Sequence, residues 1–69
     1  MRLSARNQLA GTVSAIEDGA VMTIVKVSLA GGQEVTASVT KDSVADLGLR
    51  VGSPVTAVIK STEVMLGTE

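Results

Sequence analysis

Hydrogen-bond donors gather in three short stretches of this sequence. Ser4-Ala5-Arg6-Asn7 supplies a hydroxyl, a guanidinium and an amide, and Lys60-Ser61 adds an ammonium and a second hydroxyl. Thr40 and Ser43 add two more hydroxyls at a point where a helix is expected to begin. Helix N-termini favour anions because their unpaired N–H groups point outward. A set of groups that all donate hydrogen bonds suits an anionic ligand.

Each of these stretches also has an ordinary structural interpretation. Ser4–Asn7 could be a solvated N-terminal arm, and Thr40 could be a plain helix cap. Lys60 could be an exposed edge charge that discourages aggregation. Taken alone, the residues therefore indicate a small β domain and leave anion binding as one of two interpretations.

The amino-acid composition argues against catalysis and against cation binding. The chain has no histidine and no cysteine, so the common nucleophile–base pairs, the usual zinc sites and disulfides are all excluded. A catalytic Ser–Lys pair remains formally possible at Lys60 and Ser61. Neighbouring side chains on a strand point to opposite faces, however, so this pair would not meet easily. The acidic residues lie mostly in turns or the expected helix and form no calcium-loop pattern. We therefore expect no enzyme and no direct cation site.

Net charge and hydropathy restrict the classes of binding partner and the cellular location that we expect. The net charge of −1 and the absence of Phe, Tyr and Trp argue against nucleic-acid binding, which needs a basic field and, for single strands, stacking platforms. No apolar run is long enough to span a membrane, and no signal-peptide pattern follows the N-terminal charges. The expected location is the cytoplasm.

The 69-residue length predicts a single domain over residues 1–69 with a thin core. Without aromatic residues the core must consist of small aliphatic side chains, which bury less area each. Domains of this size usually need a staple or a partner, and disulfide and zinc staples are excluded. We therefore expect an oligomer.

The pattern of apolar residues predicts an all-β fold. Period-2 alternation indicates strands, and Ala30-Gly31-Gly32-Gln33 is typical of a hairpin turn. Gly11 is expected to mark a bulge or a close backbone approach. The expected strands cover 7–17, 20–29, 34–40, 55–60 and 63–66, with a short helix over 40–48 that Gly48 ends. Five strands with one short helix between the third and fourth is the order of a small OB-like barrel.

Several of these stretches also resemble one known family. Ser4-Ala5-Arg6-Asn7-Gln8-Leu9 and Gly11-Thr12-Val13 are similar to the opening of the molbindins, the small Mop-type molybdenum-pterin-binding proteins related to TOBE domains. Leu47-Gly48-Leu49 and Ile59-Lys60-Ser61 are similar to their second half. The resemblance covers essentially the whole chain and implies a five-stranded OB-like barrel. It also implies a homohexamer, built as a trimer of dimers, that binds molybdate or tungstate at subunit interfaces.

The resemblance further implies a ligand set. The shell would be Ser4, Ala5, Arg6, Asn7, Lys60 and Ser61 from one subunit and Thr40 and Ser43 from another, with many bonds coming from backbone N–H groups. A second oxyanion site near the threefold axis would use Gly19, Ala20 and Val21, whose small size lets backbone approach an anion. Because no DNA-binding or ATPase segment accompanies the module, the expected role is molybdenum storage or homeostasis.

Two other functions stay open from the sequence. A nucleic-acid-binding OB-like domain would bind oligonucleotides with a steep salt dependence. A purely structural oligomerisation module would assemble and show no heat of binding with molybdate.

Overall fold

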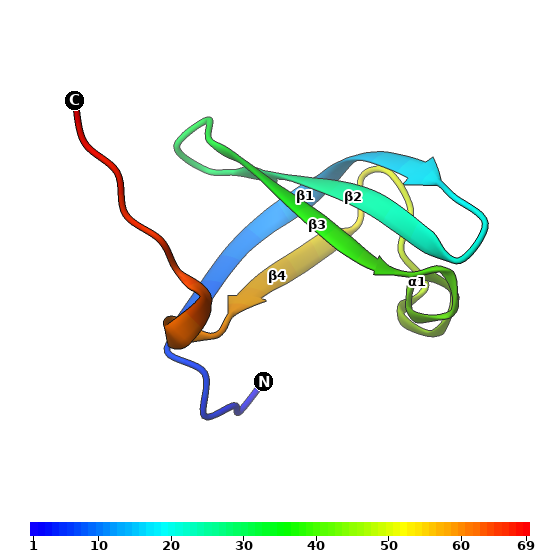
Figure 1. Cartoon of the computed structure of the whole chain (residues 1–69). Helices are drawn as coiled ribbons and strands as arrows, with labels where there is room; N and C mark the ends of the chain where they lie inside the picture. Colours follow the sequence, from blue (N-terminus) through cyan, green and yellow to red (C-terminus); the bar gives the residue numbers. More distant parts are fainter.

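The computed structural model describes residues 1–69 and shows a curled half-barrel of four antiparallel strands with one short helix (Figure 1). The elements are β1 (Asn7–Asp18), β2 (Met22–Leu29), β3 (Glu34–Thr40), helix α1 (Lys41–Leu47), β4 (Pro54–Ile59) and the 3-10 helix η1 (Ser61–Glu63). The strand order is β3-β2-β1-β4. β3 and β4 are therefore the two edges of the sheet.

The core lies on the concave face of the sheet and is built from β-branched side chains. Val13, Val25 and Val27 are almost fully buried, and Thr23 on the same face of β2 is completely buried. The alternation of Thr23, Val25 and Val27 along β2 is the period-2 pattern that the sequence predicted. These four are the only buried residues of the 69, so the core of one chain is small.

β1 contains one irregularity that sets which of its side chains reach the core. Val13 pairs with Val27 and Ala15 pairs with Lys26, so Ser14 is the extra residue of a bulge. The bulge allows both Val13 and Ile16 to pack on the core although they are three residues apart. Gly11 is not the bulge. It marks the close approach instead, because a Cβ there would lie 2.6 Å from the Ser28 carbonyl oxygen.

The helix forms where the sequence predicted it and is capped at both ends. Thr40 has extended backbone angles, and its hydroxyl accepts a hydrogen bond from the Ser43 N–H. Gly48 adopts the left-handed conformation at φ 63° and donates to carbonyls of the last turn. Val44 packs against the core, whereas Leu47 on the neighbouring turn is 70% exposed. No helix in the structure is long and apolar enough to cross a bilayer.

The expected fifth strand over Glu63–Leu66 does not form in this chain. Ser61–Glu63 make a 3-10 turn, which carries the chain away from the sheet, so the red C-terminal segment in Figure 1 runs clear of β4. Val64 has extended backbone angles, but it pairs with no strand. Alternation and apolar character were sufficient to suggest a strand, but a strand also needs a neighbour for its backbone hydrogen bonds.

The open side of the half-barrel is an apolar groove of about 410 Å³. Thirteen residues line it, eleven of them hydrophobic, and they come from β2, β3, β4 and the end of α1 with Leu49. A closed barrel would fill this space with side chains of a further strand. The groove is what remains of the barrel interior when only four strands are present.

Candidate oxyanion site

The N-terminal arm and the end of β4 lie together because β1 pairs with β4. Asn7 is opposite Ile59 in this antiparallel pair, and the Asn7 side-chain amide donates to the Ile59 carbonyl at 3.2 Å. Gln8 donates to the Ala5 carbonyl at 2.8 Å and shapes the arm. We call Ser4, Ala5, Arg6, Asn7, Lys60 and Ser61 the terminal cluster. The structure therefore brings six of the expected ligand residues to one end of the sheet.

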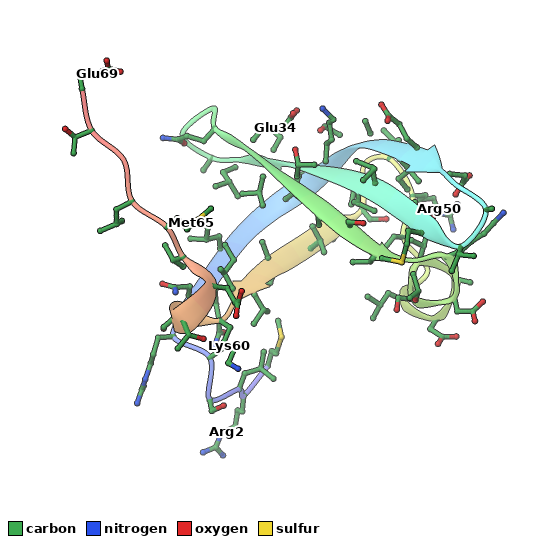
Figure 2. The ribbon with its side chains drawn as sticks, viewed as in Figure 1. Arg2, Glu34, Arg50, Lys60, Met65 and Glu69 are labelled. Atoms are coloured by element: carbon green, nitrogen blue, oxygen red, sulfur yellow. The ribbon has the colours of Figure 1, made fainter.

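The charges of the terminal cluster are available to a ligand. Arg6, Lys60 and Ser61 are exposed, and neither cation makes an ion pair. The only ion pair in the structure joins Lys26 and Glu34, whose charged atoms are 3.7 Å apart on neighbouring strands. Figure 2 shows Lys60 and Arg2 at the same end of the molecule, so a third cation lies in this region. The one carboxylate nearby in the sequence belongs to Glu63 in η1.

Thr40 and Ser43 form a second group of donors at the start of α1. Their hydroxyl oxygens are 2.7 Å apart, and the Thr40 hydroxyl oxygen also accepts from the Ser43 N–H at 3.0 Å. One hydroxyl proton is used between the two side chains, so one remains to donate elsewhere. The capping interpretation of Thr40 is confirmed, and it leaves this pair one free O–H donor.

A cavity of about 350 Å³ adjoins this helix start. Ala20 and Val21 line it together with Thr40, Lys41 and Asp42. The Lys41 N–H donates to the Val21 carbonyl at 2.8 Å, which fixes the loop before β2 against the helix. Ala20 and Val21, which are expected in the second oxyanion site, thus line the same cavity as Thr40, which is expected in the first site. We call Ala20, Val21, Thr40, Lys41 and Ser43 the helix-start cluster.

Three observations at the helix start were not expected from the sequence. Lys41 lines the cavity, although a cation is slightly unfavourable at a helix start. Asp42 places a carboxylate beside the same cavity, which disfavours an anion there unless the side chain turns away. Gly19 does not line the cavity. Its N–H donates to the Met22 carbonyl at 2.9 Å, and a Cβ there would lie 2.4 Å from that oxygen, so Gly19 is required by the turn.

The two clusters lie at opposite ends of the sheet. Thr40 ends β3 and pairs with Met22, near the end of β1, whereas Lys60 follows β4 beside the start of β1. β1 has 12 residues and covers roughly 35 Å along its path at about 3.3 Å per residue. Figure 1 shows α1 and η1 at opposite ends of the molecule. One chain therefore cannot place both clusters on one small anion.

The fold and these donor groups define a small β-sheet binding protein without a nucleophile–base pair. The family model of the TOBE domain matches residues 3–66. Over 66 residues the chain is 50% identical to molybdenum-pterin-binding protein 3 of Clostridium pasteurianum, and the match covers 96% of this chain and 97% of that protein. The chain belongs to the Mop/TOBE molybdenum-pterin-binding protein (molbindin) family, a family of binding proteins.

Solved structures that share the fold include two molybdate-binding proteins. A molybdate-binding protein from Sporomusa ovata superimposes with a TM-score of 0.91 at 43% identity, covering 99% of this chain and all of that one. The cytoplasmic molybdate-binding protein ModG, in a crystal form with molybdate bound, superimposes with a TM-score of 0.95 at 54% identity. That match covers all of this chain and 49% of the ModG chain, so this chain spans about half of ModG.

Proposed function

We propose that this protein binds molybdate or tungstate at interfaces between the subunits of a homo-oligomer. The observation that carries the proposal is the separation of the terminal cluster from the helix-start cluster, because a shell that uses both must come from two chains. The similarity to ModG, which holds molybdate, supports the identity of the anion. Ser4, Arg6, Lys60 and Ser61 of one subunit would meet Thr40 and Ser43 of another, with backbone groups of Ala5 and Asn7 assisting.

The chemistry of the donor groups suits this class of anion. Molybdate and tungstate at neutral pH are tetrahedral dianions that only accept hydrogen bonds, so a shell of hydroxyl, guanidinium, ammonium and N–H groups matches them. The proposed shell contains no carboxylate. A protonated phosphate has a hydroxyl that needs an acceptor, and is therefore disfavoured. Sulfate is smaller, so its contacts would be looser.

The proposed assembly is a homohexamer built as a trimer of dimers, as the family resemblance implies. A second oxyanion site would lie near the threefold axis at Gly19, Ala20 and Val21. The cavity lined by Ala20 and Val21 supports a position beside the helix start, and the turn bonds of Gly19 restrict its part to shaping that loop. The proposed cellular role is molybdenum storage or homeostasis in the cytoplasm, in keeping with the description of ModG as cytoplasmic.

Calorimetry paired with a mass measurement tests this function. We expect molybdate and tungstate to bind with measurable heat, and sulfate and phosphate to bind at least about tenfold more weakly, a difference of roughly 1.4 kcal/mol. Light scattering should give an oligomer. An oligomer with no heat of binding would favour a structural module. Oligonucleotide binding that weakens steeply with salt would favour a nucleic-acid-binding domain.

A further inference from the structure

Residues 1–6 form an arm that precedes β1 and carries Ser4 and Arg6 of the terminal cluster. The hydrogen bond from the Gln8 side-chain amide to the Ala5 carbonyl, at 2.8 Å, is the only one that these six residues make. We propose that Gln8 is a positioning residue of the anion shell, which orders the arm before the anion arrives and does not contact the anion itself. This inference rests on the proposed function and adds to it a residue outside the proposed ligand set.

Little else holds the arm in place. All of its residues are exposed except Ala5, which is half-buried, and none of its charged groups makes an ion pair. The first residues of β1 pair only with β4, because the pairing of β1 with β2 begins at Gly11. In Figure 1 the arm, drawn in dark blue, runs out from the sheet beside η1. The conformation of the arm in the free protein therefore depends on the Gln8 bond.

The Gln8 bond also sets the direction of a donor in the proposed shell. The chain has no cis peptide bond, and in a trans peptide the C=O and the N–H point in opposite directions. A carbonyl of Ala5 that is held toward Gln8 therefore turns the N–H of Arg6 away from Gln8. This backbone N–H keeps its direction whatever the Arg6 side chain does, so the bond prepares one donor for an anion.

The same arrangement occurs at the other cation of the terminal cluster. The Asn7 side-chain amide donates to the Ile59 carbonyl at 3.2 Å, and Ile59 directly precedes Lys60. Two adjacent amide side chains thus each hold the carbonyl that comes just before a cation. The Asn7 bond reinforces a pair of strands that is already formed, whereas the Gln8 bond is the sole hydrogen bond of the arm. Loss of the Gln8 bond should therefore have the clearer effect.

An ordered arm raises the affinity without adding a contact to the anion. When only a fraction of the molecules hold the binding conformation, the apparent dissociation constant rises by the inverse of that fraction. Loss of one neutral hydrogen bond changes such a balance by about two- to tenfold. We therefore expect loss of the Gln8 bond to weaken molybdate binding by about two- to tenfold.

Gln8→Met tests this role in the full-length protein. Methionine has nearly the length of glutamine but no N–H donor, and the net charge stays the same. Calorimetry with molybdate should give the two- to tenfold weaker binding, and light scattering should give the oligomer of the parent protein. Nuclear magnetic resonance relaxation of the ligand-free protein should show a lower order parameter for the Arg6 N–H, toward the value of about 0.6 that marks flexible backbone.

Gln33→Met is the matched control. It makes the same substitution at the only other glutamine, in the turn between β2 and β3, and should change neither the molybdate affinity nor the order of the arm. An Arg6 order parameter that is unchanged in Gln8→Met overturns the proposal. A loosened arm with unchanged molybdate affinity also overturns it, because Gln8 would then be structural only. If the parent protein binds no molybdate, the proposed function itself fails, which the calorimetry of the parent shows separately.

Discussion

Lys60 is the residue on which the proposed anion shell depends most. It is an exposed cation at the end of β4 with no carboxylate partner, and the arm that carries Arg6 lies beside it. A dianion that is partly removed from water needs positive charge near it. Hydrogen bonds to charged groups contribute roughly 1.5–3 kcal/mol each, so Lys60→Ala should weaken molybdate binding by about tenfold to a hundredfold. Calorimetry measures the affinity, and light scattering should show that the oligomer persists.

Lys26 provides the control of equal charge. It lies in the middle of β2 and pairs with Glu34, far from both clusters along the sheet. Exposed ion pairs of this kind contribute about 0–1 kcal/mol, so Lys26→Ala should change neither molybdate affinity nor assembly. If Lys60→Ala binds molybdate as tightly as the parent protein, the assignment of the terminal cluster is wrong. Arg6→Ala will have the smaller effect if Arg6 contributes through its backbone N–H.

At Gly11 the sheet leaves no room for a side chain. A Cβ at this position would lie 2.6 Å from the Ser28 carbonyl and 2.7 Å from Val27 Cγ1, so β1 and β2 would have to move apart. We expect Gly11→Ala to lower the free energy of unfolding by about 1–3 kcal/mol, as overpacking does. Chemical denaturation measures the change. Gly31→Ala is the control, since its Cβ would meet only the flexible Gln33 side chain, and a loss as large there would contradict the explanation.

At the scale of the element, the N-terminal cap at Thr40 stabilises helix α1. The Thr40 hydroxyl accepts from the Ser43 N–H at 3.0 Å and thereby satisfies a donor of the first helical turn. Removing such a cap costs about 1 kcal/mol, so Thr40→Ala should lower the free energy of unfolding by roughly that amount and also weaken molybdate binding. Thr40→Ser keeps the oxygen and should retain most of both. If thermal unfolding and calorimetry show the two variants to be equally impaired, the hydroxyl is not the group that acts.

Elements that depend on a short stretch of sequence could be predicted from the sequence alone. The Gly31-Gly32 turn and the strand from Glu34 to Thr40 were placed correctly, because alternation and a two-glycine turn act over a few residues. The bulge at Ser14 was missed, since it depends on pairing with β2 and not on β1 alone. The strand expected at Glu63–Leu66 was wrong, because a strand needs a paired neighbour for its backbone hydrogen bonds and alternation alone does not provide one.

The residue types of the candidate site stay a prediction, and their arrangement in space could not be predicted from the sequence. The pairing of β1 with β4 joins the arm to Lys60 across more than fifty positions of sequence, which composition cannot reveal. The lining of the helix-start cavity by Lys41 and Asp42 was also missed, because it depends on how the loop through Val21 docks on α1. That these residues form a ligand shell remains a prediction from the family resemblance.

At the scale of the whole molecule, the small core and the open groove both favour association. Only four residues of one chain are buried, while eleven hydrophobic residues line an open groove. Burial of apolar surface contributes roughly 25 cal/mol per Å², so closing the groove should add much of the stability that one chain lacks. We therefore expect folding and assembly to be coupled, so that the stability of the protein depends on its concentration.

Thermal unfolding over a range of protein concentrations tests this coupling. The unfolding midpoint should rise when the protein concentration is raised about a hundredfold, because association draws the equilibrium toward the folded state. Molybdate at about a hundred times its dissociation constant should add roughly 2.7 kcal/mol per independent site to the folded state, and sulfate at the same concentration should add much less. At the same molybdate concentration, the Lys60→Ala protein should keep the concentration dependence and lose roughly half or more of the molybdate shift, since only the ligand contact is removed. A midpoint that stays constant on dilution would mean that one chain is stable alone, and the interface site would then lack its physical basis.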